Sequence, residues 1–483
     1  MNGYKSIIII LCFFFVGLLN SQFLLDGALF EIFVLDVMGF YFLFRVFGAG
    51  LRVMLLALLG ILIGMARLFF SFGADDNFVV NFLGEREVEG CIKEVDVRVD
   101  KVKYTISLER MREGEEWREI NGLLLVNGER YPVYKFGHCL NLQGEILIPH
   151  MIDTFNYGGY LSRFNIFAVM YFAEIRKVSG ENGNKLMKFL FELKSVFEGQ
   201  LEKLYLEPEN SFMAGLLLGS RRGIPDHLME NFNITGLTHI IAISGYNITI
   251  IIVIIGNIFS FLSRKIRIIV SSIFIILFVI LVGANAAVVR AGIMGVIGLL
   301  ALWSGRNYLA PLALLWACFF MNFWNPRILL YDVGFQLSVL ATGGLIFVSP
   351  RIEKYFTFLP KFLEIRESIL MTLSAQILAL PIILMNFGRL SLISPIANLF
   401  VLPMLPFTMF FGFLGVMGAF VYQKLGLLFA YIGYVFLKLI VFLVEKFALI
   451  PLASLDINFF SKWVLVFYYF LILDWLLKDL GSF

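Results

Sequence analysis

Residues 236–262 read GLTHIIAISGYNITIIIVIIGNIFSFL, an apolar stretch long enough to cross a lipid bilayer. Its first half nevertheless carries polar or small residues at His239, Ser244, Gly245 and Asn247. Polar residues in a membrane segment are costly and usually face the interior of a helix bundle or a water-filled cavity. They also form hydrogen bonds between neighbouring helices, so a polar pathway and helix packing both remain open for this stretch.

Most of the remaining chain is similarly apolar. Of the 483 residues, 59% are hydrophobic and only 16% are charged, whereas soluble globular proteins average about 25% charged residues. Long apolar runs recur, such as ILIGMARLFFSF, IFIILFVILVG and LVFYYFLILDWLL. The sequence therefore predicts a polytopic α-helical membrane protein. The net charge of +3 says little, because membrane topology governs where the charges are placed.

Hydropathy divides the chain into consecutive parts. We expect N-terminal transmembrane segments in 1–72, an extracytoplasmic β domain in 73–180, an amphipathic surface helix with a connector in 181–235, and a membrane domain in 236–483. The first apolar run lacks a small-residue cleavage site, so it is predicted to be a retained span and not a signal peptide.

The predicted number of membrane crossings is about 11–13, given apolar runs of about 20 residues per crossing. The least regular region is 391–422, an apolar run that is too long for one straight span. Proline removes backbone hydrogen bonds from a helix, so we expect broken or re-entrant pieces here, at Pro395, Pro403 and Pro406.

Basic residues set the orientation of the spans, because cytoplasmic loops are enriched in Lys and Arg. Lys5 precedes the first span, and alternation then places Arg264, Lys265 and Lys478 on the same side. Both termini are therefore predicted to be cytoplasmic, with the β domain outside.

The polar region 73–180 shows strand-like alternation at 88–97 and 102–110, and CLNLQGEILI at 139–148 resembles a further strand. Asn127-Gly128 is predicted to be a hairpin turn. Several short strands without a long helix favour a small OB-like β-barrel, and a sandwich is the alternative.

The net charge of this domain bears on what it binds. Residues 73–180 contain 17 acidic and 13 basic residues, a net charge of −4, whereas nucleic-acid-binding domains usually carry a basic surface. DNA binding and a structural lid both remain open. The helical spacing of apolar residues in 185–205 predicts an amphipathic helix on the outer membrane surface or against the barrel.

Cys91 and Cys139 lie in two of the predicted strands, on the oxidising side of the membrane. A disulfide between them is therefore predicted. It would close a loop of roughly 50 residues and stabilise the domain by about 3–4 kcal/mol.

Two downstream motifs add polar groups to the membrane domain. Arg290 lies in the apolar stretch GANAAVVRAGIMG and keeps its charge, so it needs an acid, backbone carbonyls or a wet cavity. Asp332 is the candidate acid. The second motif, NPRILLYDVGFQLSVLATGG at 325–344, places Gln336 and Ser338 at the head of the next span.

No catalytic centre, metal site or cofactor site is predicted. The four histidines are scattered, without HxH or HExxH spacing. The GxxxxGK[ST] phosphate loop is also missing from the sequence, so we expect no nucleotide hydrolysis by this chain and no enzymatic activity.

The strings TGLTHIIAISGYNITI, VVRAGIMG and YDVGFQLSVLATGGL resemble the ComEC family of competence proteins. The preceding AGLLLGSRRGIPDHLMENFNI and the segment TFNYGGYLSRFNIFA at 154–168 are similar to the family in the same order. The resemblance runs from about residue 85 to the C-terminus.

This resemblance implies a channel in the bacterial inner membrane that passes single-stranded DNA into the cytoplasm during natural transformation. We expect the pathway to be lined by His239, Ser244, Asn247, Arg290, Gln336 and Ser338. The partners expected besides DNA and lipid are a separate DNA receptor, a nuclease and a cytoplasmic motor.

Two departures from the family limit what the resemblance implies. Asn247 stands where the family usually has a histidine, so a proton-coupled role is not expected there. The sequence contains no HxHxDH motif of the metallo-β-lactamase-like domain that many members carry, so we expect the nuclease to be another protein.

Two other functions remain as alternatives. A small-solute secondary transporter would place its binding site on broken helices near the membrane midplane. A membrane-embedded transferase would need clustered acids or histidines within the membrane, and the sequence shows none.

Overall fold

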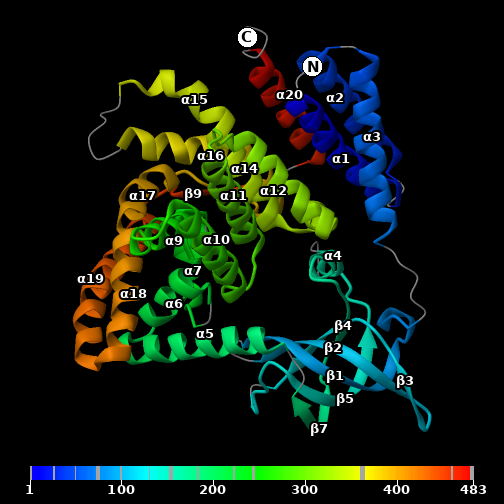
Figure 1. Cartoon of the computed structure of the whole chain (residues 1–483), viewed down its shortest axis with the longest axis vertical. Helices are drawn as coiled ribbons and strands as arrows, with labels where there is room; N and C mark the ends of the chain where they lie inside the picture. Colours follow the sequence, from blue (N-terminus) through cyan, green and yellow to red (C-terminus); the bar gives the residue numbers. More distant parts are fainter. Residues whose placement is uncertain are drawn as a thin grey trace. The chain divides into compact units, whose positions relative to one another are not determined.

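The computed structural model describes residues 3–25, 28–48, 50–71, 77–97, 101–129, 131–151, 156–181, 184–220, 223–241, 245–358, 365–457 and 461–478. The chain divides into two compact units. The helical unit consists of 1–72, 226–414 and 428–483, and the sheet unit consists of 73–225 and 415–427. Figure 1 colours both units along the chain.

A seven-stranded sheet forms the centre of the sheet unit. Its strands are β1 Gly84–Val97, β2 Val102–Glu113, β3 Glu116–Glu119, β4 Leu123–Gly128, β5 His138–Leu147, β6 Ile166–Met170 and β7 Glu174–Glu181. The pairings run β1–β2–β4–β6–β5 and return to β1, while β3 pairs with β2 and β7 with β5. Only β4–β6 is parallel among these pairs. A separate sheet domain is thus confirmed, whereas its OB-like character stays a prediction.

The core of this sheet follows the period-two pattern of the sequence. In β2, Tyr104 and Ile106 are buried on one face, and they pack in one cluster with Val88 of β1 and Leu140 of β5. Side chains of a strand alternate between its two faces, so this pattern identifies the inner face. The strands predicted at 88–97, 102–110 and 139–148 are confirmed.

The hairpin predicted at Asn127-Gly128 is wrong. Both residues belong to β4, where they lie in register with Lys103 and Val102 of β2. The described residues that follow, 131–137, form no returning strand. Pro132 interrupts that run and has no N–H to donate to a strand ladder. The second neighbour of β4 is instead the parallel strand β6.

Three helices belong to the sheet unit: α4 Tyr157–Ser162, α5 Lys185–Leu204 and α6 Glu209–Leu218. Helix α5 is the helix predicted at 185–205, and the side chain of Asn184 caps it by accepting the N–H of Leu186. The Phe191 ring of α5 lies 4.9 Å from that of Phe136 in the loop before β5. Contact of α5 with the membrane surface stays a prediction.

The helical unit begins with three helices, α1 Gly3–Leu25, α2 Leu29–Phe47 and α3 Leu51–Phe69. The second segment adds α7 Asp226–Thr235, α8 Thr238–Ile241, α9 Gly245–Ile258, α10 Arg264–Leu281, α11 Ala286–Trp303, α12 Ala310–Trp324, α13 Ile328–Tyr331, α14 Val333–Gly343, α15 Ser349–Ile352, α16 Ile365–Phe387, β8 Arg389–Ser391 and α17 Ser394–Val401. Helices α18 Leu405–Val421 and α19 Gln423–Ala448 come next, and β9 Ser454–Asp456 and α20 Lys462–Lys478 follow. Residues 415–427, at the end of α18 and the start of α19, are assigned to the sheet unit.

Seven helices in the described part of the chain are long and apolar enough to cross a membrane. They span Lys5–Leu24, Leu51–Phe69, Ala286–Trp303, Val333–Phe356, Ile365–Phe387, Ser394–Val421 and Gln423–Ala448. The shorter apolar helices include α12 and Asn247–Ile258 of α9. The multi-pass helical architecture is therefore supported, and the larger number of about 11–13 crossings stays a prediction.

Two of these long spans are irregular. In 394–421, a 3₁₀ turn at Leu402–Met404 separates α17 from α18, in the region where the prolines predicted a break. In 333–356, a π-helical turn at Gly344–Val348 follows α14. Such turns often mark functional segments.

Helix α16 contains Pro381, which has no N–H and therefore leaves the carbonyl of Ile377 without its helical partner. The hydroxyl of Tyr468 in α20 donates to this carbonyl at 2.9 Å. The neighbouring Tyr469 hydroxyl donates to Leu378 O, also at 2.9 Å. Unpaired backbone groups are costly in hydrocarbon, so α20 compensates for the proline in α16.

Replacing Tyr468 by phenylalanine is expected to destabilise the detergent-solubilised protein by about 1–3 kcal/mol, because a partly buried carbonyl loses its donor. Thermal unfolding of the purified full chain measures this loss. The control is Tyr431→Phe on α19, whose side chain is exposed. Equal melting temperatures for the two variants would contradict the compensating role of Tyr468.

Candidate functional site

Arg290 is the charged centre of the candidate site. It lies on α11 and is only 8% exposed. Its Nε donates to Ser338 Oγ of α14 at 2.9 Å, and its Nη1 lies 3.3 Å from Met294 Sδ. Among the residues that the structure describes, no carboxylate lies within ion-pair distance of this guanidinium.

Asp332, which the sequence offered as the acidic partner of Arg290, has another role. Its Oδ1 accepts the backbone N–H of Phe335 at 2.9 Å and so caps α14. A carboxylate at a helix N-terminus satisfies N–H groups that have no partner within the helix. Among the described residues, Asp332 therefore does not serve as the ion-pair partner of Arg290.

A cavity of about 460 Å³ opens beside Arg290. Helices α9 and α11 form two of its sides, and Tyr308 of the following loop contributes a third. The polar groups on its lining are Arg290, Thr249 and Tyr308, and the rest is glycine or aliphatic. Pockets of about 300–1,000 Å³ hold small molecules and cofactor-sized groups.

Gly245, the first residue of α9, keeps this cavity open toward Arg290. A Cβ atom added at Gly245 would lie 3.3 Å from Ala291 Cβ and 3.7 Å from Arg290 Nη2. A larger side chain would therefore occupy the space in front of the guanidinium. In the sequence, this glycine is marked only as a small residue in the first half of an apolar stretch.

The structure separates the other residues predicted for the pathway. His239 lies on the short helix α8, where its Nδ1 is 3.1 Å from Gly236 O. Asn247 is buried on α9, so the two residues lie on separately described helices. Ser244 lies outside the described residues.

Gln336 and Ser338 point to different partners although both lie on α14. Ser338 contacts Arg290, as described above. Gln336 Nε2 donates to the carbonyls of Leu329 and Leu330, both at 2.9 Å, and so ties α13 to α14. Two residues of the cavity, Thr249 and Tyr308, were not predicted, because their distance in sequence from Arg290 gives no sign of proximity.

A second polar cluster fixes the segment that precedes α9. Arg389 of β8 bridges Glu230 of α7 at 2.5 Å and Asp456 of β9 at 2.7 Å. The hydrogen bond from Arg389 lowers the pKa of Glu230 below its usual value. Gly236 has φ +71°, and a Cβ there would lie 3.0 Å from the Cβ of Ser394, so the start of the 236–262 stretch packs closely on α17.

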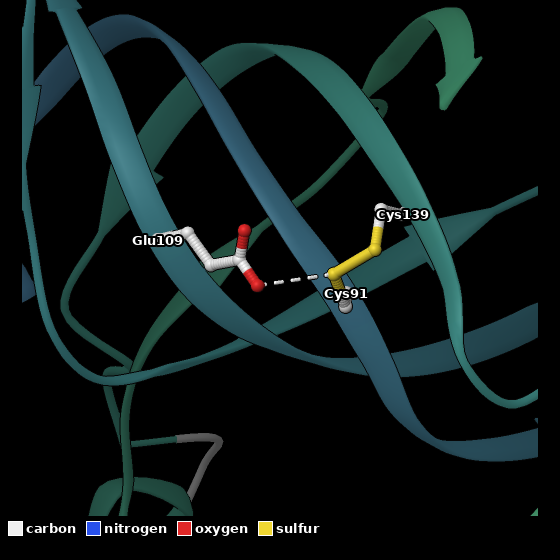
Figure 2. Close-up of side chains that lie close together, drawn as sticks. All are labelled: Cys91, Glu109 and Cys139. Carbon is white, nitrogen blue, oxygen red and sulfur yellow. Dashed lines mark hydrogen bonds between the residues drawn. A yellow bond between two sulfur atoms is a disulfide. The ribbon is translucent and has the colours of Figure 1, made fainter. Parts of the chain in front are cut away.

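The sulfurs of Cys91 and Cys139 are bonded in a disulfide between β1 and β5, where the two residues are directly opposite. Figure 2 shows Glu109 of β2 beside them, with its Oε1 3.2 Å from Cys91 Sγ. The three donor atoms lie within 4.8 Å of one another, the spacing of a metal site. Sulfurs joined in a disulfide are not thiolate ligands, however, so with the bond closed this cluster does not offer a thiolate metal site.

Comparison with known proteins agrees with the resemblance seen in the motifs. The chain is 27% identical over 260 residues to ComE operon protein 3 of Bacillus subtilis (strain 168). This alignment covers 53% of the chain and 32% of the relative, so the chain spans about a third of that protein's length. No solved structure significantly matches the chain. The family model described as "Competence protein" matches residues 216–479, more than half of the chain, and the protein therefore belongs to the Competence protein family.

Proposed function

We propose that this protein is a channel of the bacterial inner membrane that passes single-stranded DNA into the cytoplasm during natural transformation. The observation that carries the proposal is the Arg290 cavity in a multi-pass member of the Competence protein family. Arginine stays charged at any physiological pH and binds phosphate oxygens through a planar set of N–H donors.

The lining of the cavity suits a polyanion that is handled without regard to sequence. One cationic group, Arg290, contacts phosphate, while the aliphatic surface of α9 and α11 and the ring of Tyr308 accept the faces of bases. Binding of single strands typically combines backbone charge with stacking that tolerates every base. A carboxylate beside Arg290 would cancel this attraction, and none is paired with it in the described residues.

The proposed topology places both termini in the cytoplasm and the sheet unit outside the cell. The sheet domain then lies where disulfides persist. Capture of DNA, degradation of one strand and inward pulling are assigned to separate partners, namely a DNA receptor, a nuclease and a cytoplasmic motor.

Uptake of labelled double-stranded DNA by cells that lack this chain tests the proposal. Surface-bound label is expected to persist, while label protected from external nuclease disappears and returns on complementation. Unchanged protected label in the deletion, without a second gene copy, would instead favour transport of a small solute.

Partial occlusion of the cavity localises the pathway. Gly245→Val is expected to reduce protected label about 5- to 150-fold, the factor that corresponds to an overpacking cost of about 1–3 kcal/mol, because the added side chain begins 3.7 Å from Arg290 Nη2. The matched control is Gly256→Val on the same helix, where an added Cβ meets nothing within 4 Å. Equal uptake by the two variants at equal expression would remove the cavity from the pathway.

A further inference from the structure

The Cys91–Cys139 disulfide is asymmetric in its exposure. Cys91 is 3% exposed, whereas Cys139 is only partly buried. An external thiol or disulfide therefore reaches Cys139 first, and Cys91 is the inner sulfur that completes the bond. A thiol must lose its proton to become a nucleophile, and burial in apolar surroundings makes that loss harder. The inner cysteine thus needs a proton acceptor close by.

A β-bulge supplies such a group. In the β1–β2 pairing, Glu89 is opposite Arg110 and Gly90 is opposite Leu108, so Glu109 is the extra residue of β2 at this register shift. The bulge breaks the in–out alternation, because Glu109 and Arg110 are both exposed. Bulges commonly re-aim a side chain, and here Glu109 Oε1 comes within 3.2 Å of Cys91 Sγ (Figure 2).

In the disulfide, Cys91 Sγ carries no hydrogen, so this contact is a close approach between two acceptor atoms. The geometry becomes favourable when the bond is open, because a Cys91 S–H then donates to the carboxylate at hydrogen-bond distance. The contact therefore suits the reduced state and the step that closes the bond.

We propose that Glu109 is the general base that closes the Cys91–Cys139 disulfide. The oxidant is a low-molecular-weight or protein disulfide, RSSR. The Cys139 thiolate attacks RSSR, one RS⁻ leaves, and a mixed disulfide forms on Cys139. Cys91 Sγ then attacks Cys139 Sγ while its proton passes to Glu109, and the second RS⁻ leaves. Two electrons move from the cysteine pair to RSSR, which becomes two thiols after protonation.

Glu89, two residues before Cys91 in β1, is engaged with other residues. Glu89 of β1 pairs with Arg110 of β2 at 2.6 Å and also accepts a hydrogen bond from Asn141 of β5 at 3.2 Å. Other titratable residues close in sequence to the two cysteines are Lys93 of β1 and His138 of β5. The carboxylate described within hydrogen-bond distance of Cys91 Sγ is that of Glu109.

The rate at which the disulfide closes in the full-length purified protein tests this role. Cys12→Ala and Cys318→Ala remove the two other cysteines. The protein is reduced, freed of reductant and mixed with oxidised glutathione. Acid quenching, alkylation and mass spectrometry then follow conversion of the glutathione mixed disulfide to the internal disulfide.

Glu109→Gln is expected to slow this conversion about 100-fold at pH 6, the lower end of general-base contributions. Its rate should fall about tenfold per pH unit below the thiol pKa, because only the thiolate then attacks. With Glu109 present the fall should be shallower, because the Cys91 thiol then loses its proton as it attacks. Glu109→Asp should be intermediate, and Glu116→Gln on the exposed strand β3 should match the parent.

The outcomes distinguish a role of Glu109 as proton acceptor from a role in packing alone. The same rate and pH slope for Glu109→Gln and the parent would overturn the proposal. A slower rate with an unchanged slope would also overturn it, since that pattern indicates altered packing. If Glu109→Gln does not fold, the Glu109→Asp rate and slope decide in the same way. This inference does not depend on DNA transport.

Discussion

Replacing Arg290 by glutamine is expected to lower the uptake of nuclease-protected DNA about 10- to 100-fold while surface binding of DNA is unchanged. Glutamine keeps hydrogen-bonding capacity and much of the volume, but it removes the charge. A hydrogen bond to a charged group contributes about 1.5–3 kcal/mol, which corresponds to this change in rate if phosphate contacts Arg290 in the slow step. The contrast with surface binding distinguishes passage through the membrane from capture at the cell surface.

Three further variants sharpen this test. Arg290→Lys keeps a point charge without the planar donor set, so its uptake should be intermediate. Ser338→Ala removes the side chain that receives Arg290 Nε at 2.9 Å and should lower uptake less than loss of the charge. Arg306→Gln, at an exposed position beyond α11, is the control and should behave like wild type. Wild-type uptake by Arg290→Gln at normal expression would exclude Arg290 from the pathway.

Replacing Cys139 by serine is expected to destabilise the sheet unit by about 4 kcal/mol, the chain-entropy estimate for a loop of this length. The two cysteines are 48 residues apart, and they join strands that lie next to each other in the sheet. Limited proteolysis at increasing temperature measures the effect, because cleavage within 73–180 reports opening of this unit. The closed loop contains β2, β3 and β4, so all three strands should become sensitive together.

Cys318→Ala is the matched control for this measurement. Cys318 is a buried free thiol of the helical unit, and its replacement should leave proteolysis of 73–180 unchanged. A Cys139→Ser protein with the protease resistance of the wild type would show that the sheet is held by its core alone.

Local patterns predicted a good part of the fold. Period-two alternation located β1, β2 and β5, because each buries one face in a single core. Helical spacing located α5, whose polar and apolar faces differ clearly. These signals come from neighbouring residues, so they can be seen in one sequence. The Asn127-Gly128 signal failed because tertiary pairing with β2 and β6 kept both residues in a strand.

Two residues of the candidate site, Arg290 and Ser338, stood out in the sequence, but their arrangement did not. A charged Arg290 in an apolar helix indicated a special position, and the hydroxyl of Ser338 indicated a polar helix head. Their contact joins residues 48 positions apart and depends on the packing of α11 and α14. The sequence around Tyr308 shows no unusual pattern. Its role in the site is visible only from the cavity that it lines.

The contact between Tyr468 and the carbonyl of Ile377 also bears on the order in which the protein is made. The two residues are 91 positions apart, so at about 5–20 residues per second the ribosome needs several seconds after Ile377 before Tyr468 exists. During that interval α16 enters the bilayer with a vacant carbonyl at its proline. Helix α20 therefore completes the hydrogen bonding of α16 only late in synthesis. Chains released before α20 has been made are expected to be substrates for membrane quality-control proteases.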